Sequence, residues 1–91
     1  MKPIEETSQS ILLESKNAQP HELVLFNDEV NTFDHVIEML VAICNHSYLQ
    51  AEQCAFIVHH KGKCTVKTGS YDELKPKCLK LLEAGLSAEI S

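Results

Sequence analysis

A chain of 91 residues has room for one domain with one core. Its 13 acidic and 8 basic residues give a formal charge of -5, which argues against nucleic acid as a partner, because phosphate backbones attract basic surfaces. No stretch resembles a signal peptide, and no window approaches the roughly 18 apolar residues of a membrane span. We therefore expect a cytoplasmic protein that is not inserted in a membrane.

The first elements in chain order are a polar segment and a short strand. Residues 1–21 carry mainly polar side chains around the apolar triplet Ile11-Leu12-Leu13, and we expect a flexible tail, followed by a domain over residues 22–91. Residues 22–26 read E-L-V-L-F, which is typical of a buried strand, and the turn-forming pair Asn27-Asp28 ends it.

A helix is predicted over residues 32–45. Its apolar side chains recur with the spacing of one helix face, and Asn31 followed by Asp34 suggests an N-cap with a weak capping box. The predicted core face consists of Val36, Ile37, Leu40, Val41 and Cys44.

The next predicted pair is a helix and a strand. Ser47 with Gln50 fits a capping box, and Gly62 offers a left-handed stop after His59-His60. Residues 63–68 alternate polar and apolar side chains and contain β-branched residues, so they predict a second strand. The predicted core face of this second helix consists of Leu49, Cys54, Ile57 and Val58.

The last elements are a third helix and a short strand over residues 86–90. Ser70 and Glu73 form a further capping signal, and Gly85 ends the helix. Pro76 would be its sixth residue, where proline loses a hydrogen bond at a cost of about 3 kcal/mol, so we expect a kink or a helix that begins at Pro76. The order is β-α-α-β-α-β, and the predicted core face of this helix consists of Leu74, Cys78, Leu81 and Leu82.

Metal binding and cysteine catalysis are two alternatives for function. Histidines and four cysteines are present, but the cysteines lie 10, 10 and 14 residues apart, without the short paired spacings of structural zinc sites. Each cysteine also falls on or beside an apolar segment, unlike a reactive thiolate, and this pattern indicates reduced thiols in a reducing compartment. We expect neither a metal nor a cofactor.

A recognition cluster is the third alternative. It consists of polar side chains after the first strand, the start of the first helix, and a histidine at the end of the second helix. Ordinary turn chemistry and a favourable helix-dipole contact explain the same residues without any function, so spacing alone leaves both interpretations open. The cluster comprises Asn27, Asp28, Glu29, Asn31, Phe33 and His59.

Two sequence blocks in register resemble the ClpS family, the protease adaptors of the bacterial N-end rule. They are L-V-L-F-N-D-E-V-N-T-F-D-H-V-I-E-M-L over residues 23–40 and A-F-I-V-H-H-K-G-K over residues 55–63. The resemblance implies an α+β fold, with a three-stranded antiparallel sheet covered on one face by three helices. It also implies binding of N-degron clients without enzymatic activity, and we expect a monomer.

The resemblance places the contacts to the client's α-amino group on Asn27, Asp28 and His59. An ammonium has only donors, so it requires acceptors such as an amide oxygen, a carboxylate and a neutral imidazole nitrogen. Protonation of His59 would turn an acceptor into a donor, so we expect binding to weaken at acidic pH.

The resemblance also implies a pocket for a bulky N-terminal side chain. The matching positions of Phe33 and Ala55 are commonly methionine in the family, so we expect Ala55 to enlarge the pocket, Phe33 to refill part of it, and Ile, Val or Met to be tolerated better. Asn31 stands where threonine is usual, and both residues can cap a helix. Core packing is the alternative for Phe33 and Ala55. The pocket residues are Asn31, Phe33, Val36, Ala55 and Val58, and Glu29 is a further candidate contact.

The family presents the start of its third helix to the N-terminal domain of a AAA+ unfoldase of the ClpA or ClpC kind. Asp72 and Lys77 occupy the matching positions, and the tail would take part in delivery. A rival from another class is the C-terminal domain of the ribosomal stalk protein, which shares the β-α-α-β-α-β order and has no amine site.

Overall fold

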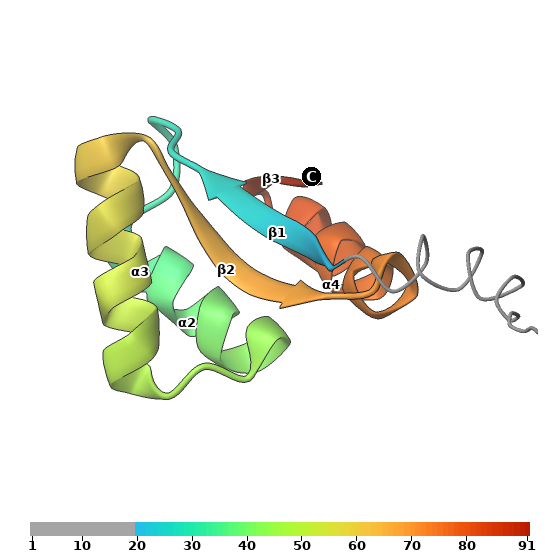
Figure 1. Ribbon diagram of the computed structural model, residues 1–91. Coiled ribbons are helices and arrows are strands. Elements are labelled where there is room, and N and C mark those ends of the chain that lie inside the picture. Colours follow the sequence, from blue (N-terminus) through green and yellow to red (C-terminus); the bar gives the residue numbers. More distant parts are fainter. Residues whose placement is uncertain (1–19) are drawn as a thin grey trace, which may run out of the picture.

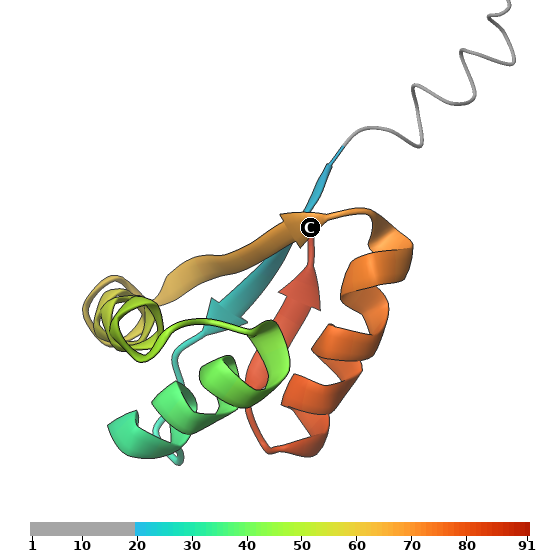
Figure 2. The ribbon, with the colours of Figure 1, turned by 90° about the horizontal axis from the view of Figure 1, so that it is seen from below.

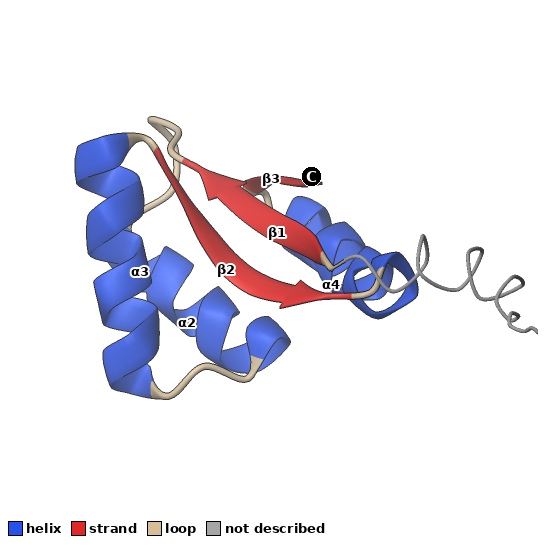
Figure 3. Ribbon diagram, in the orientation of Figure 1, coloured by secondary structure: helices blue, strands red, loops and turns tan. Residues whose placement is uncertain are grey.

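The computed structural model describes residues 20–91, so nearly all of the expected tail lies outside the described residues. Within this described part, three strands and three helices follow one another in the predicted β-α-α-β-α-β order (Figures 1 and 3). They are β1 (His21–Phe26), α2 (Phe33–Cys44), α3 (Tyr48–Lys61), β2 (Lys63–Gly69), α4 (Tyr71–Glu83) and β3 (Ser87–Ile90).

The sheet has the order β2-β1-β3, and both pairings are antiparallel. Phe26 pairs with Lys63 of β2 and with Ser87 of β3, and the β1–β2 register shifts between Leu23 and Val24. The apolar run of β1 suits this central place, because Leu23, Val24 and Leu25 are all buried.

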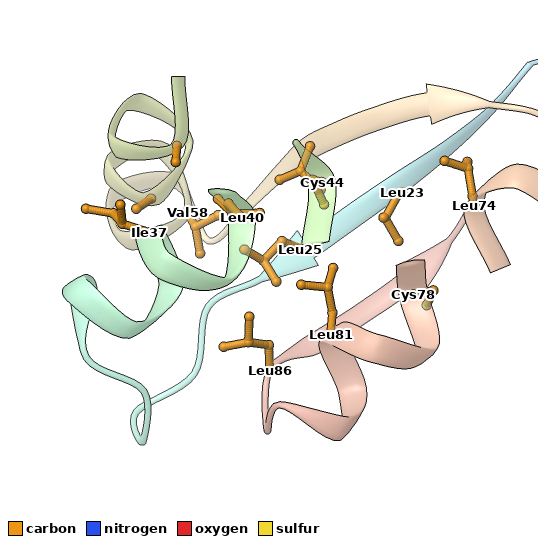
Figure 4. Close-up of a cluster of buried hydrophobic side chains, with 13 residues drawn as sticks. Leu23, Leu25, Ile37, Leu40, Cys44, Val58, Leu74, Cys78, Leu81 and Leu86 are labelled. Atoms are coloured by element: carbon orange, nitrogen blue, oxygen red, sulfur yellow. The ribbon is translucent and has the colours of Figure 1, made fainter. Parts of the chain in front are cut away.

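All three helices lie on one side of the sheet, as Figure 2 shows, with α2 between α3 and α4. The predicted α+β architecture is therefore confirmed. The core lies between this helical layer and the sheet, where Leu25 meets side chains from α2, α3 and α4 (Figure 4). Its largest fully buried side chains are Leu23, Leu25, Leu40, Leu74, Leu81 and Cys44.

The N-cap of α2 corrects one prediction. Thr32, and not Asn31, has the extended cap conformation, and its side chain accepts from the backbone N–H of His35 at 3.1 Å. Asn31 is engaged elsewhere, as described below for the site. Asn45 ends the helix in the left-handed conformation with φ 59°.

The buried face of α3 also differs from its prediction. Ser47 and Gly62 cap the helix as expected. Its buried residues, however, are Ala51, Ala55 and Val58, whereas Leu49 is 61% exposed and Ile57 is 40% exposed. Because alanine side chains are short, α3 can pack close to its neighbours with Ala51 and Ala55 facing the core. The larger Leu49 and Ile57 are exposed on other faces of the helix.

Helix α4 begins at Tyr71 and runs through Pro76, so it does not begin at the proline. The predicted capping box fixes its start: the Ser70 N–H donates to Glu73 Oε1 at 2.9 Å, and the Glu73 N–H donates to Ser70 Oγ at 3.1 Å. Leu74, Cys78 and Leu81 are buried as predicted, while Leu82 is 46% exposed.

Replacing Pro76 with alanine is expected to raise the free energy of unfolding by about 1–2 kcal/mol. Alanine restores the missing backbone donor inside the helix, although loss of the proline also frees the unfolded chain and reduces the gain. Urea denaturation measures the change, and Lys75→Ala, at the exposed neighbouring position, serves as the control. An unchanged or lower stability of the Pro76 variant would contradict this account.

Candidate functional site

The loop after β1 lies against the end of α3. The backbone N–H of Asn27 donates to the carbonyl of Gly62 at 2.9 Å, directly beyond the pairing of Phe26 with Lys63. This contact holds the first residue of the loop beside the last turn of α3, which carries His59. Two segments more than thirty residues apart in sequence therefore meet at one end of the sheet.

Asp28 organises the loop. Its Oδ1 accepts from the backbone N–H groups of Val30 and Asn31, both at 2.8 Å, and its Oδ2 accepts from the Asn31 side-chain amide at 2.8 Å. The backbone hydrogen bond from Asn31 is the main cause that lowers the pKa of the Asp28 carboxyl, with further lowering by the Asn31 amide and the Val30 N–H. The loop thus holds a fixed negative charge.

Asn31 joins this loop to the opposite side of the fold. Its Nδ2 donates both to Asp28 Oδ2 and to the carbonyl of Gly85, each at 2.8 Å. A second contact runs parallel to it, since His35 Nε2 donates to the carbonyl of Ala84 at 3.0 Å. The turn between α4 and β3 therefore supports both the loop and the first turns of α2.

One cavity of about 360 Å³ is lined by every residue that the sequence placed in the amine contact and the side-chain pocket. Polar side chains come from the loop and from His59, whereas the apolar wall comes from α2 and α3. The lining residues are Asn27, Asp28, Glu29, Asn31, Phe33, Val36, Ala55, Val58 and His59.

The chemistry of the cavity is divided between an acceptor-rich side and an apolar wall. Within residues 20–91, neither the side-chain amide of Asn27 nor the His59 ring has a hydrogen-bonding partner. The His59 ring packs edge-on against the His60 ring, with ring centroids 5.1 Å apart. Ala55 and Val58 are buried in the wall. The arrangement can bind a small cationic group next to an apolar one.

Asp72 and Lys77 lie on α4, away from this cavity. Five positions on a helix correspond to a rotation of about 140° between them, so they do not share one face. Asp72 is exposed, whereas the Lys77 ammonium donates to the carbonyl of Ile43 at 3.4 Å, near the end of α2. Lys77 thus has a contact of its own within the fold.

Two features of this region were not found from the sequence. One is the bond from Asn31 to Gly85, which spans 54 residues and leaves no local signal. The other is a second hollow beside the cavity, which is lined in part by the exposed side chains of Phe56 and Ile57. The even spread of apolar residues around α3 was a signal for it, because such a helix cannot bury all of them on one side.

Burial acts against a reactive thiolate at three of the four cysteines. Burial raises the pKa of the Cys44 and Cys78 thiols, and burial followed by the neighbouring Cys64 thiol raises the pKa of Cys54 to about 12. Within residues 20–91, no group of three or more His, Cys, Asp or Glu residues could hold a metal ion. In the same part of the chain, no helix has the length and apolar character needed to cross a bilayer.

A solved structure shares this fold. Agrobacterium tumefaciens ClpS2 bound to L-phenylalaninamide superposes with a TM-score of 0.68, covering 79% of this chain and 94% of that chain. The two sequences are 20% identical, so this likeness concerns the architecture alone.

Sequence comparison identifies the family. The model of ClpS, the ATP-dependent Clp protease adaptor protein, matches residues 16–89. The adapter protein ClpS of Treponema denticola is 34% identical over 64 residues, and that of Acetivibrio thermocellus is 31% identical over 62 residues. These alignments cover 70% and 68% of this chain, which spans 63% of the length of each relative. The chain belongs to the ClpS family of Clp protease adaptors.

Proposed function

We propose that this protein binds the free α-amino group and the bulky apolar first side chain of N-degron clients and delivers them to a Clp AAA+ unfoldase. The single observation that carries the proposal is the cavity of about 360 Å³, in which acceptors and an apolar wall face the same space. The chain itself catalyses nothing, and peptide cleavage belongs to the protease.

The amine contact rests on Asn27, Asp28 and His59. Asp28 supplies the negative charge, directly or through water, and the other two supply acceptors that no residue of 20–91 occupies. Charge-assisted hydrogen bonds are about twice as strong as neutral ones, so an ammonium is favoured over an amide N–H. An acetylated or internal amine is an uncharged amide, so it would form weaker hydrogen bonds with these acceptors than an ammonium does.

The side-chain pocket rests on Phe33, Val36, Ala55 and Val58, with Asn31 and Glu29 at its polar edge. The small side chain of Ala55 leaves room in the wall, so the pocket accepts Leu and Phe and also tolerates Ile, Val and Met. The solved relative supports a ligand of this kind, because L-phenylalaninamide carries an amine next to an apolar ring.

The partner is the N-terminal domain of an unfoldase of the ClpA or ClpC kind. Asp72, exposed at the start of α4, is the residue of the pair best placed to contact it, since Lys77 is bonded to α2. Residues 1–21 act as the delivery tail of the domain formed by residues 22–91, and the adaptor works as a cytoplasmic monomer. The ribosomal stalk domain, the rival interpretation, offers no counterpart to the cavity of about 360 Å³, which we call the amine cavity.

Acetylation of a client peptide is expected to abolish measurable binding. Fluorescence anisotropy with a labelled peptide beginning with Leu, and with its N-acetylated form, measures the difference. A peptide beginning with Ser and carrying a free amine serves as the control for the pocket. Equal affinity of the free and acetylated peptides would overturn the proposed function.

A further inference from the structure

A second hollow of about 550 Å³ lies beside the amine cavity, between the start of α2 and the middle of α3. Its walls are mainly apolar, and three partly exposed apolar side chains gather there: Phe33 is 41% exposed, Phe56 is 56% exposed and Ile57 is 40% exposed. We call this surface the apolar groove, and it is lined by Phe33, Glu52, Gln53, Phe56 and Ile57.

The groove adjoins the amine cavity, because Phe33 lines both. The other groove residues come from α3, and Ala55 and Val58 on the same helix face the amine cavity. A peptide held in the amine cavity by its first residue therefore has the groove as its neighbour across a single side chain.

The alternation of side chains along an extended peptide determines which of its residues can reach the groove. Side chains alternate in direction along an extended chain, so the first and third residues point to the same side, about 7 Å apart. For a chain that leaves the amine cavity across Phe33, the second side chain points away from the protein and the third lies beside the groove on the far side of Phe33.

We propose that the apolar groove is a binding subsite for an apolar or aromatic side chain at the third position of the client. This inference rests on the proposed function and extends it from the first residue of the client to a short motif. The polar groups of Glu52 and Gln53 at the groove remain available to the client backbone N–H groups.

The test compares free-amine peptides of the form Leu-Ser-X and Leu-X-Ser, followed by a constant labelled sequence, with X as Phe or Ser. Phe at the third position is expected to bind about tenfold tighter than Ser there, since it buries an aromatic ring. At the second position the same exchange is expected to change affinity less than threefold. Equal affinities for Phe and Ser at the third position, or a gain at the second position instead, would overturn the proposal.

Two variants locate the effect in the groove. Phe56→Ala and Ile57→Ala are each expected to reduce the tenfold preference for Phe at the third position to threefold or less. The Phe56 ring packs on the His60 ring with centroids 4.1 Å apart, and the His60 ring in turn packs on that of His59. Phe56→Ala can therefore also weaken the amine contact. That effect would lower both affinities equally, and the ratio within each variant isolates the groove.

Leu79→Ala is the matched control, because Leu79 is 49% exposed on α4 and lines neither hollow. A preference that survives both groove variants, or that Leu79→Ala removes equally, contradicts the subsite. If sedimentation velocity shows a dimer that Phe56→Ala dissociates, while the preference stays unchanged, the groove is a contact between two copies and the proposal is wrong.

The acetylated form of Leu-Ser-Phe distinguishes a failure of the groove subsite from a failure of amine recognition. If free peptides bind and acetylated ones do not, yet Phe and Ser at the third position are equivalent, only the groove inference fails. If the acetylated peptide binds as tightly as the free one, the proposed amine recognition fails.

Discussion

Asp28→Asn is expected to lower the affinity for a peptide beginning with Leu by about 100-fold. A hydrogen bond to a charged group contributes about 1.5–3 kcal/mol, and the upper part of that range corresponds to 100-fold. The asparagine oxygen can still accept from the N–H groups of Val30 and Asn31, so the loop retains its turn. Its NH2 group cannot accept from the Asn31 side-chain amide, so the variant loses that contact together with the charge. Titration of the labelled peptide by anisotropy measures the loss.

Glu29→Gln, at the polar edge of the same cavity, tests whether the charge of the loop alone accounts for this change. It removes one negative charge from the same loop, but Glu29 is exposed and organises no neighbouring backbone group within residues 20–91. We expect a loss of less than about threefold, as for an exposed charge screened by salt. If both variants weaken binding equally, net charge of the loop and not Asp28 itself attracts the amine.

The Asp28 carboxyl also makes stability depend on pH. Its pKa is lowered in the folded protein, chiefly by the Asn31 N–H, so the carboxylate form binds its partners more strongly than the acid form. This contribution is fully present above the ordinary carboxyl pKa and is lost as the pH falls through the lowered value. The stability difference between the protein and Asp28→Asn should therefore shrink below about pH 4.

The capping residues show how much of the fold was predictable from sequence. Ser47 and Ser70 were identified correctly, because a serine followed three residues later by Gln or Glu is a local signal. Asn31 was identified wrongly, because Asn and Thr both cap helices, Asn is the better of the two in general, and they stand side by side here. The deciding partner of Asn31 is Gly85, far away in sequence, and no local pattern reports it.

The core face of α3 was mispredicted for a related reason. Hydrophobicity alone selected Leu49 and Ile57, yet close packing favoured the alanines. How near a helix lies to its neighbours is a property of the assembled fold, so the groove that Ile57 helps to line was not located from the sequence. The even spread of apolar residues around α3 signalled only that some of them would be exposed. The grouping of the residues that line the cavity could be predicted, because they stand in two contiguous blocks that resemble the family.

Ala55→Met is expected to lower the affinity for a peptide beginning with Ile about 30-fold relative to one beginning with Leu. Ala55 is buried at 3% exposure in the wall of the cavity, and a methionine there would extend into the space that a β-branched side chain occupies. Crowding of this kind costs about 1–3 kcal/mol, which corresponds to roughly 5- to 150-fold.

The unmodified protein should bind peptides beginning with Ile within about tenfold of those beginning with Leu. The Leu peptide is the internal control in both proteins, since a variant that folds poorly loses affinity for both peptides, whereas a narrowed pocket loses affinity for Ile. A thermal melt of Ala55→Met monitors the fold independently. Should Ile bind at least a hundredfold worse than Leu in the unmodified protein, Phe33 rather than Ala55 sets the width of the pocket.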